Sequence, residues 1–279
     1  MLTLVLADTE LERVPLPLQH HPAVRASARK RGRSPAAILL DSSLHHPALR
    51  RHPEGERRGR PDIAHIVLVV ALDSILNLEG GLRVFIHTRN DEAIQFAPET
   101  RIPKSFTRFV GLMEDLFEKG EVPEENPLIR MDREVTLEQL LAKLGGEPWA
   151  FTEGGDPIDL GTGLPPQTTD LVAVIGGFPH GDFRSPVSTL CKRVVSIYPK
   201  PLKAWTTTAE VLIAYRRPRA RSESEPVMGA AVAAAQGMAP PPSRARPRGT
   251  GKPAAGRARP AGARRRRTRR GAGRPPGTA

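Results

Sequence analysis

Hydrophobic positions in the first 215 residues occur in two patterns, short apolar stretches and runs with apolar residues three or four positions apart. Stretches of strand length occupy residues 1–7, 37–40, 171–175 and 193–198. Apolar runs without polar alternation are typical of strands that are buried on both faces of a parallel sheet. Residues 82–88 and 92–97 alternate instead, and the turn residues Arg89-Asn90-Asp91 between them predict a β-hairpin.

Helical spacing follows several of these stretches. Leu202, Trp205, Ala209 and Leu212 form one apolar stripe, and residues 137–144 after Thr136 predict a short helix. A third stripe, which we interpret as core or dimer surface, consists of Phe109, Leu112, Met113, Leu116 and Phe117. Asp8-Thr9 is expected to cap a helix, 19–33 to form an exposed helix or loop, and 145–169 to be loop. Together these elements predict an α/β protein.

Residues 59–77 (GRPDIAHIVLVVALDSILN) are ambiguous by pattern. Their β-branched residues favour a strand. Pro61 as a first helical residue, Asp62 in the first turn and the length of the segment favour a helix. Arg60 and Asp62 are close enough at a helix start to form an ion pair, which by itself is also typical of an ordinary helix N-terminus.

Two predicted strands end in loops that keep the backbone accessible. Residues 171–175 lead into Gly176, Gly177 and later Gly181, and residues 193–198 lead into Pro199-Lys200-Pro201. Ligands of open α/β sheets bind at the carboxyl ends of strands. We therefore expect the two strand ends to lie side by side over one pocket, although an ordinary crossover with tight turns fits the same pattern.

Charge divides the chain into two parts. Residues 216–279 contain 17 Lys+Arg and 2 Asp+Glu, a net charge of +15, whereas residues 1–215 contain 25 and 28, a net charge of −3. The basic part consists mostly of Arg, Pro, Ala and Gly, so we expect a disordered tail that contacts RNA non-specifically. Residues 1–215 are then the folded domain.

Other chemistry is limited. The single cysteine, Cys191, excludes an internal disulfide and fits a reducing compartment, and a buried, inert thiol is the preferred interpretation. His45 and His46 lack the accompanying ligands of a metal site, so we expect surface or capping roles and no metal. No apolar run is long enough to span a membrane and no signal peptide is evident, so a cytoplasmic protein is expected.

Arg101, Lys104 and Arg108 are three and four residues apart, which would place three cations on one side of a helix or helix entry. On a domain with little net charge, such a trio suits the phosphate backbone of a nucleic acid. A solvated basic face is the alternative.

Several motifs resemble one family. IGGFPHGDF followed by SIYPKPL, the stretch LLDSSLHHPALRR, RPDI with the later LDS and LN, and RIPKSFTRF are similar to segments of the SPOUT-class methyltransferases that methylate N1 of pseudouridine in small-subunit ribosomal RNA. The resemblance spans most of residues 1–215. It implies a mostly parallel sheet with helices on both faces, a small hairpin and helix insertion near 77–105, and a C-terminal trefoil knot. It also favours a helix for residues 59–77.

The resemblance further implies S-adenosylmethionine as cofactor, a homodimer and ribosomal RNA as partner. The implied cofactor-binding residues are Gly176, Gly181, Ser196, Ile197, Tyr198, Pro199, Lys200 and Pro201. By this resemblance Arg60 is the catalytic residue that acts on the base, and Asp62 is the residue that orients Arg60. The implied RNA contacts are Arg60, Arg101, Lys104 and Arg108. Lys104 stands where the family usually has an arginine, and lysine lacks the planar fork for a bidentate phosphate contact.

The chemistry agrees with this assignment. Pseudouridine exposes an N–H at N1 that must lose its proton before the nitrogen can attack a methyl donor. A cation near the base carbonyls, Arg60, would stabilise the anion as it forms. Asp62 would orient Arg60 rather than accept the proton, because an ion pair with arginine stabilises the carboxylate. The alternative function is a non-catalytic ribosome-assembly factor that binds rRNA through the same cations.

Overall fold

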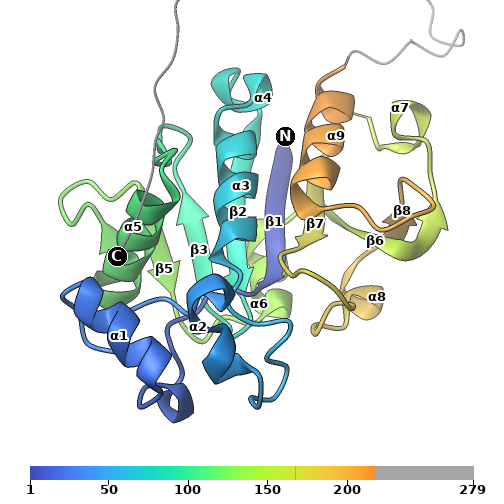
Figure 1. The fold of residues 1–279 in the computed structure, drawn as a ribbon. Helices are drawn as coiled ribbons and strands as arrows, with labels where there is room; N and C mark the ends of the chain where they lie inside the picture. Colours follow the sequence, from blue (N-terminus) through green and yellow to red (C-terminus); the bar gives the residue numbers. More distant parts are fainter. Residues whose placement is uncertain (167, 218–279) are drawn as a thin grey trace, which may run out of the picture. The chain divides into compact units, whose positions relative to one another are not determined.

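The computed structural model describes residues 1–166 and 168–217. Its centre is a sheet of eight strands in the order β4-β5-β3-β2-β1-β7-β6-β8 (Figure 1). The strands from β2 to β8 in this order pair in parallel, and β3, β5 and β4 extend the sheet in antiparallel fashion. The sheet is therefore mostly parallel, as the sequence predicted.

The strands are β1 (Leu2–Thr9), β2 (Leu82–Thr88), β3 (Ala93–Phe96), β4 (Glu121–Val122), β5 (Ile129–Asp132), β6 (Glu147–Pro157), β7 (Leu171–Gly176) and β8 (Arg193–Ser196). The helices are η1 (Leu16–Leu18), α1 (Pro22–Lys30), α2 (Ser42–Leu49), α3 (Pro61–Leu72), α4 (Ile75–Leu78), α5 (Phe106–Lys119), α6 (Leu137–Leu144), α7 (Leu160–Gly163), α8 (Val187–Leu190) and α9 (Ala204–Arg216).

Both faces of the sheet are covered, and the side-chain alternation of the strands explains how. Leu4 and Leu6 of β1 pack into the core under α3, α5 and α9, whereas Val5 and Ala7 pack into a second core under α6 and α8. Figure 1 shows α3, α5 and α9 on the face towards the viewer and α6 behind the sheet. Because successive side chains of a strand point to opposite faces, a strand between two layers must be apolar at every position.

Most predicted elements are confirmed. Residues 171–175 form a strand buried on both faces, and residues 82–88 and 92–97 form an antiparallel hairpin. Most of residues 59–77 is helical, from Pro61 onward, with a break between α3 and α4 at Asp73 and Ser74. Thr136 caps α6 in a capping box with Gln139. The stripe of α5 is core, since Phe109, Met113, Leu116 and Phe117 are buried.

Four predictions about the fold are wrong. Residues 37–40 do not form a strand, because in this run only Leu39 makes an isolated bridge, to Arg13. Residues 145–169 are not a loop, because residues 147–157 form β6. Asp8 and Thr9 do not cap a helix and instead end β1. The strands that end at Gly176 and Ser196 are not neighbours, because β6 lies between them in the sheet.

Two segment boundaries expected from the sequence, those of the insertion and of the basic tail, do not coincide with the ends of helices and strands in the structure. Residues 77–105, expected as an insertion, contain β2, which pairs with β1 in the middle of the sheet. Helix α9 continues one residue past Tyr215, and Arg216 binds Glu79 through Nε and Nη2 at 3.0 and 2.8 Å. The remainder of the predicted basic tail, residues 218–279, lies outside the described residues.

Candidate active site

A cavity of about 480 Å³ lies at the carboxyl end of β7 and beside the middle of β6. We call it the main cavity, and it lies within the size range of small-molecule and cofactor sites. Four segments line it: the middle of β6, the end of β7 with the following loop, the start of α9 and the start of α3. Its lining residues are Arg60, Ile63, Phe151, Thr152, Glu153, Ile175, Gly176, Phe178, Pro179, His180, Gly181, Phe183, Pro201, Leu202, Lys203, Ala204, Trp205 and Thr207.

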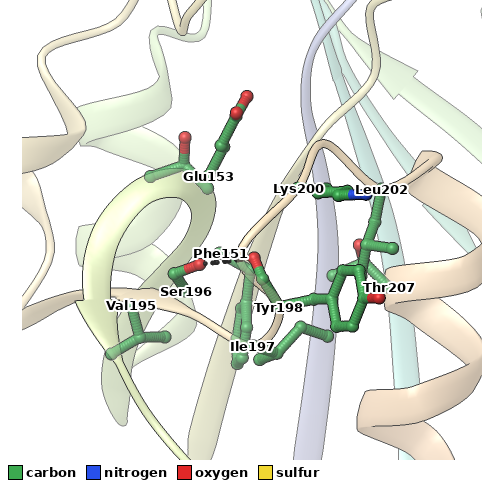
Figure 2. A pocket seen from close by; sticks show the side chains of 10 residues that line it. Phe151, Glu153, Val195, Ser196, Ile197, Tyr198, Lys200, Leu202 and Thr207 are labelled. Carbon is green, nitrogen blue, oxygen red and sulfur yellow. Dashed lines mark hydrogen bonds between the residues drawn. The ribbon is translucent and has the colours of Figure 1, made fainter.

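A smaller cavity of about 60 Å³ shares part of this lining (Figure 2). The side cavity, as we call it, is enclosed by the segment after β8 and shares Phe151, Thr152, Glu153, Leu202 and Thr207 with the main cavity. The Ser196 hydroxyl donates a hydrogen bond of 3.0 Å to the carbonyl of Tyr198, which closes the turn that follows β8.

The predicted cofactor residues divide between these cavities. Gly176, Gly181 and Pro201 line the main cavity, and Ser196, Ile197, Tyr198 and Lys200 line the side cavity. Pro199 lines neither cavity. The two loops therefore meet at a shared wall, even though a strand separates the ends of β7 and β8.

Glycine is required at both predicted loop positions, for different reasons. A Cβ at Gly176 would lie 2.5 Å from the ring of Phe178, which also lines the main cavity. Gly181 has a φ of +82°, which L side chains rarely adopt. At Gly176 the glycine thus makes room for an aromatic wall of the cavity.

The middle of β6 contributes lining residues that the sequence did not indicate. Phe151, Thr152 and Glu153 are common to both cavities. The glycines and proline that follow them led us to expect a loop, but β6 continues through a register shift against β8 between Phe151 and Asp156. The one local signal was the short run Trp149-Ala150-Phe151, whose aromatic residues favour a strand.

Arg60 and Asp62 form the predicted ion pair at the start of α3. Nε and Nη2 of Arg60 donate to the two carboxylate oxygens of Asp62 at 2.8 and 2.7 Å. These hydrogen bonds raise the pKa of Arg60 above its ordinary value, despite the opposing effect of burial. The guanidinium is therefore a fixed cation beside the main cavity, with 29% of the side chain exposed.

The three predicted RNA-contacting cations precede or begin α5. Arg101 and Lys104 lie before the helix, which starts at Phe106, and only Arg108 lies within it. The carbonyl of Pro103 lies 2.8 Å from Nε2 of His65 on α3, so this segment is joined to the helix that starts beside Arg60. All three side chains are exposed, but Lys104 pairs with Asp73 at 2.5 Å.

Asp8 holds the end of the loop that follows β7. Its carboxylate accepts hydrogen bonds from the backbone N–H groups of Arg184 and Ser185 at 2.6 and 2.8 Å, and from the Ser185 hydroxyl at 2.7 Å. Burial by itself would raise the pKa of Asp8, but His87, whose Nδ1 lies 3.6 Å from Oδ1, and the hydrogen bonds from Ser185 and Arg184 together lower it to about 2. The carboxylate is therefore a structural anion at neutral pH.

The remaining candidates are structural. His45 is buried rather than at the surface, and its Nδ1 accepts a hydrogen bond of 3.1 Å from the backbone N–H of Asp41, the residue that caps α2. Burial lowers the pKa of His45. Burial also raises the pKa of the Cys191 thiol to about 11, as expected for an inert thiol. Within residues 1–166 and 168–217, no cluster of side chains suits a metal and no helix could span a membrane.

Comparison with known proteins identifies relatives over the same residues. The EMG1/NEP1 methyltransferase family matches residues 4–216. The chain is 47% identical over 216 residues to the ribosomal RNA small subunit methyltransferase Nep1 of Methanothrix thermoacetophila. This match covers 77% of this chain and 95% of that protein. It is 48% identical over 217 residues to the Nep1 of Thermococcus onnurineus, with coverage of 76% and 97%.

A solved structure gives the same result. The crystal structure of Archaeoglobus fulgidus Nep1 bound to S-adenosylhomocysteine matches with a TM-score of 0.68 and 36% sequence identity. The match covers 76% of this chain and 96% of that one.

Proposed function

Because the chain belongs to the EMG1/NEP1 methyltransferase family, we propose that it transfers a methyl group from S-adenosylmethionine to N1 of a pseudouridine in small-subunit ribosomal RNA. The observation that carries this proposal is the main cavity, where the glycine-bearing loop after β7 and the cation Arg60 line the same space. A cofactor and a reacting base can therefore meet there. The fold is that of the SPOUT class, and the trefoil knot stays a prediction.

The cavity fits the cofactor in size and in lining. Ile175, Phe178 and Leu202 offer apolar surface, and Thr152, Glu153 and Thr207 offer polar atoms that suit hydroxyl and amino groups. The cofactor supplies an electrophilic methyl group on a sulfonium. The protein's own task is then to hold donor and acceptor in line and to stabilise the charge that develops on the base.

Arg60 provides that charge stabilisation in our proposal. Loss of the N1 proton puts negative charge on the pseudouracil ring and its carbonyl oxygens. A fixed guanidinium at the cavity wall stabilises this anion more than the neutral base, which lowers the barrier. Asp62 holds two of the guanidinium's donor nitrogens, and no hydrogen bond from Nη1 is found within residues 1–166 and 168–217, so we assign Nη1 to the base. We assign the proton to water.

Arg101, Lys104 and Arg108 contact the RNA backbone in this proposal. Their exposure suits phosphate contacts, and the tether from Pro103 to His65 keeps their segment beside α3. Residues 218–279 add a sequence-independent positive charge that raises RNA affinity without selecting the nucleotide. A protein that acts on rRNA is consistent with a location in the cytoplasm.

We further propose a homodimer, whose contact surface includes the helix from Leu202, as first expected, but not the helix after Arg108. The apolar stripe of α5 is used within the chain, so it is not available to a partner. Helix α9 packs against α3 and α4, and these helices expose Ile66, Ile75, Leu78 and Ile213. Light scattering should give twice the monomer mass for the wild type, and a monomeric mass at micromolar concentration would refute the dimer.

The substrate assignment is tested by methyl incorporation into two matched RNA hairpins, one with uridine and one with pseudouridine at the target. Only the second should be labelled, because uridine has its glycosidic bond at N1 and offers no N–H there. Equal labelling of both hairpins would contradict the assignment. Tight binding of both without labelling would instead support the non-catalytic assembly factor.

A further inference from the structure

Glu10 directly follows β1, and its carboxylate is fully buried. Its backbone is hydrogen-bonded both to the loop after β7 and to Arg60. Its backbone N–H donates to the carbonyl of Gly177 at 3.0 Å, and its own carbonyl accepts from the N–H of Arg60 at 2.9 Å. The backbone of one residue therefore joins the loop after β7 to Arg60 at the wall of the main cavity.

The carboxylate of Glu10 is held by two arginines. Arg57 donates from Nε at 2.7 Å, and Arg89 donates from Nη1. Both arginine side chains are nearly buried, with 11% and 4% exposed. A buried carboxylate with charge-assisted partners on two sides is held firmly, because loss of either partner would leave unpaired charge inside the protein.

Arg57 extends from Glu10 to the loop that lines the main cavity. Its Nη1 donates to the backbone carbonyl of Asp182 at 2.7 Å, and its guanidinium carbon lies 4.0 Å from the centre of the Phe178 ring. Arg57 thus contacts the loop at both its first aromatic residue and its far end. Arg57 itself is not among the residues that line the cavity, so any effect on the cofactor must act through the loop.

Only an arginine can make these contacts together. The planar guanidinium presents donors in several directions and stacks on an aromatic ring, whereas a lysine ammonium is a single compact charge. The loop contains Pro179 and Gly181, and a Cβ at Gly181 would lie 3.2 Å from Nη1 of Arg57. The loop and the guanidinium therefore fit each other closely.

We propose that Arg57 is a positioning residue for the cofactor, which fixes the loop from Phe178 to Asp182 in its binding conformation. A loop that is already ordered loses less conformational entropy when its ligand binds, so the affinity for the cofactor is higher. This role rests on the proposed cofactor site and adds to it a residue outside the cavity.

The test is Arg57→Lys in the full-length chain, with calorimetric titration of S-adenosylhomocysteine and of the pseudouridine hairpin. Lysine retains the charge beside Glu10 but loses the stacking and the bond to Asp182. We expect the dissociation constant of S-adenosylhomocysteine to rise about tenfold, as for the loss of one or two net hydrogen bonds. The KM for S-adenosylmethionine should rise with it, while kcat at saturation and RNA affinity stay near the wild-type values.

Arg58→Lys is the matched control. Arg58 has the same 11% exposure, and it binds the buried Glu12 through Nε and Nη2 at 2.8 and 2.5 Å. None of its hydrogen bonds reaches the loop after β7 in the described part of the chain. The control should lower the thermal midpoint by a similar amount without changing cofactor affinity. An equal loss of cofactor affinity in both variants, or no loss in Arg57→Lys, would overturn the proposal.

A second pair of variants leaves the buried ion pairs intact and remains informative if Arg57→Lys does not fold. Phe178 and Phe183 both line the main cavity and pack edge to face, with ring centres 5.3 Å apart, and the Arg57 guanidinium lies over the ring of Phe178. Phe178→Leu should weaken the binding of S-adenosylhomocysteine more than Phe183→Leu does. Equal losses of affinity in the two variants would count against positioning by Arg57. Absence of binding by the wild type would instead overturn the proposed function.

Discussion

Asp62 holds Arg60 by two parallel hydrogen bonds, from Nε at 2.8 Å and from Nη2 at 2.7 Å, so that the guanidinium is fixed in orientation at the wall of the main cavity. Arg60→Ala should lower kcat by about two to three orders of magnitude, as for the loss of one preorganised charge-stabilising donor. RNA affinity should change little, because the charge that Arg60 meets exists mainly in the transition state. Asp62→Ala should give a milder form of the same loss. Single-turnover methylation and filter binding measure the two quantities, and a loss confined to RNA binding would contradict the role.

Gly176→Val tests the cofactor wall. A Cβ at this position meets the Phe178 ring at 2.5 Å, so valine must displace a residue that lines the main cavity. We expect the affinity for S-adenosylhomocysteine to fall by more than about tenfold, which corresponds to about 1.4 kcal/mol. Calorimetric titration measures this change, with circular dichroism to establish that the variant is folded. Unchanged affinity in a folded variant would refute the assignment of this wall.

The three cations near α5 should differ in their contribution to RNA binding. Arg101 and Arg108 are exposed, and no ion pair to either is found in residues 1–166 and 168–217, whereas Lys104 is paired with Asp73. Arg101→Ala and Arg108→Ala should each reduce the slope of log affinity against log salt by about 0.7 to 0.9. Lys104→Ala should change the slope less, and Asp73→Asn should raise affinity at low salt. Equal slopes for all of these variants would contradict the assignment.

The hydrogen bonds to Asp8 predict that the free energy of unfolding falls at acidic pH. The folded-state pKa is about 2 and the ordinary value is 3.8, so the folded state favours the carboxylate. This contribution, about 2 kcal/mol, is complete above pH 4 and is lost as the pH falls towards 2. Asp8→Asn should therefore be less stable than the wild type at pH 7, and the difference should shrink between pH 4 and 2. Urea unfolding at a series of pH values measures it, and a constant difference would exclude this cause.

Removal of residues 218–279 should weaken RNA binding at low salt and leave the methylated nucleotide unchanged. Charge of this kind interacts with phosphates whatever the base sequence, so its contribution falls steeply with added salt. Binding at two salt concentrations and mapping of the modified nucleotide would establish both points. A deletion that redirected methylation to another nucleotide would show that the tail selects the target.

The sequence by itself determined the elements whose information is local. Continuous apolar residues specified the doubly buried β7, alternation specified the hairpin of β2 and β3, and Thr136 with Gln139 specified the start of α6. The pairing of Arg60 with Asp62 was also local, because only two positions separate them. Motif resemblance extended this reading to the cofactor, the substrate and eight of the residues that line the two cavities.

Tertiary structure decided the arrangements that depend on contacts between distant residues. The position of β6 between β7 and β8 brought Phe151, Thr152 and Glu153 into the cavity, although their local sequence predicted a loop. The bond from Arg57 to Asp182 joins residues 125 positions apart, and Glu10 links both to Arg60. Periodicity reports only which face of an element is buried, whereas neighbours in a sheet and partners of buried charges are chosen by packing of the whole chain.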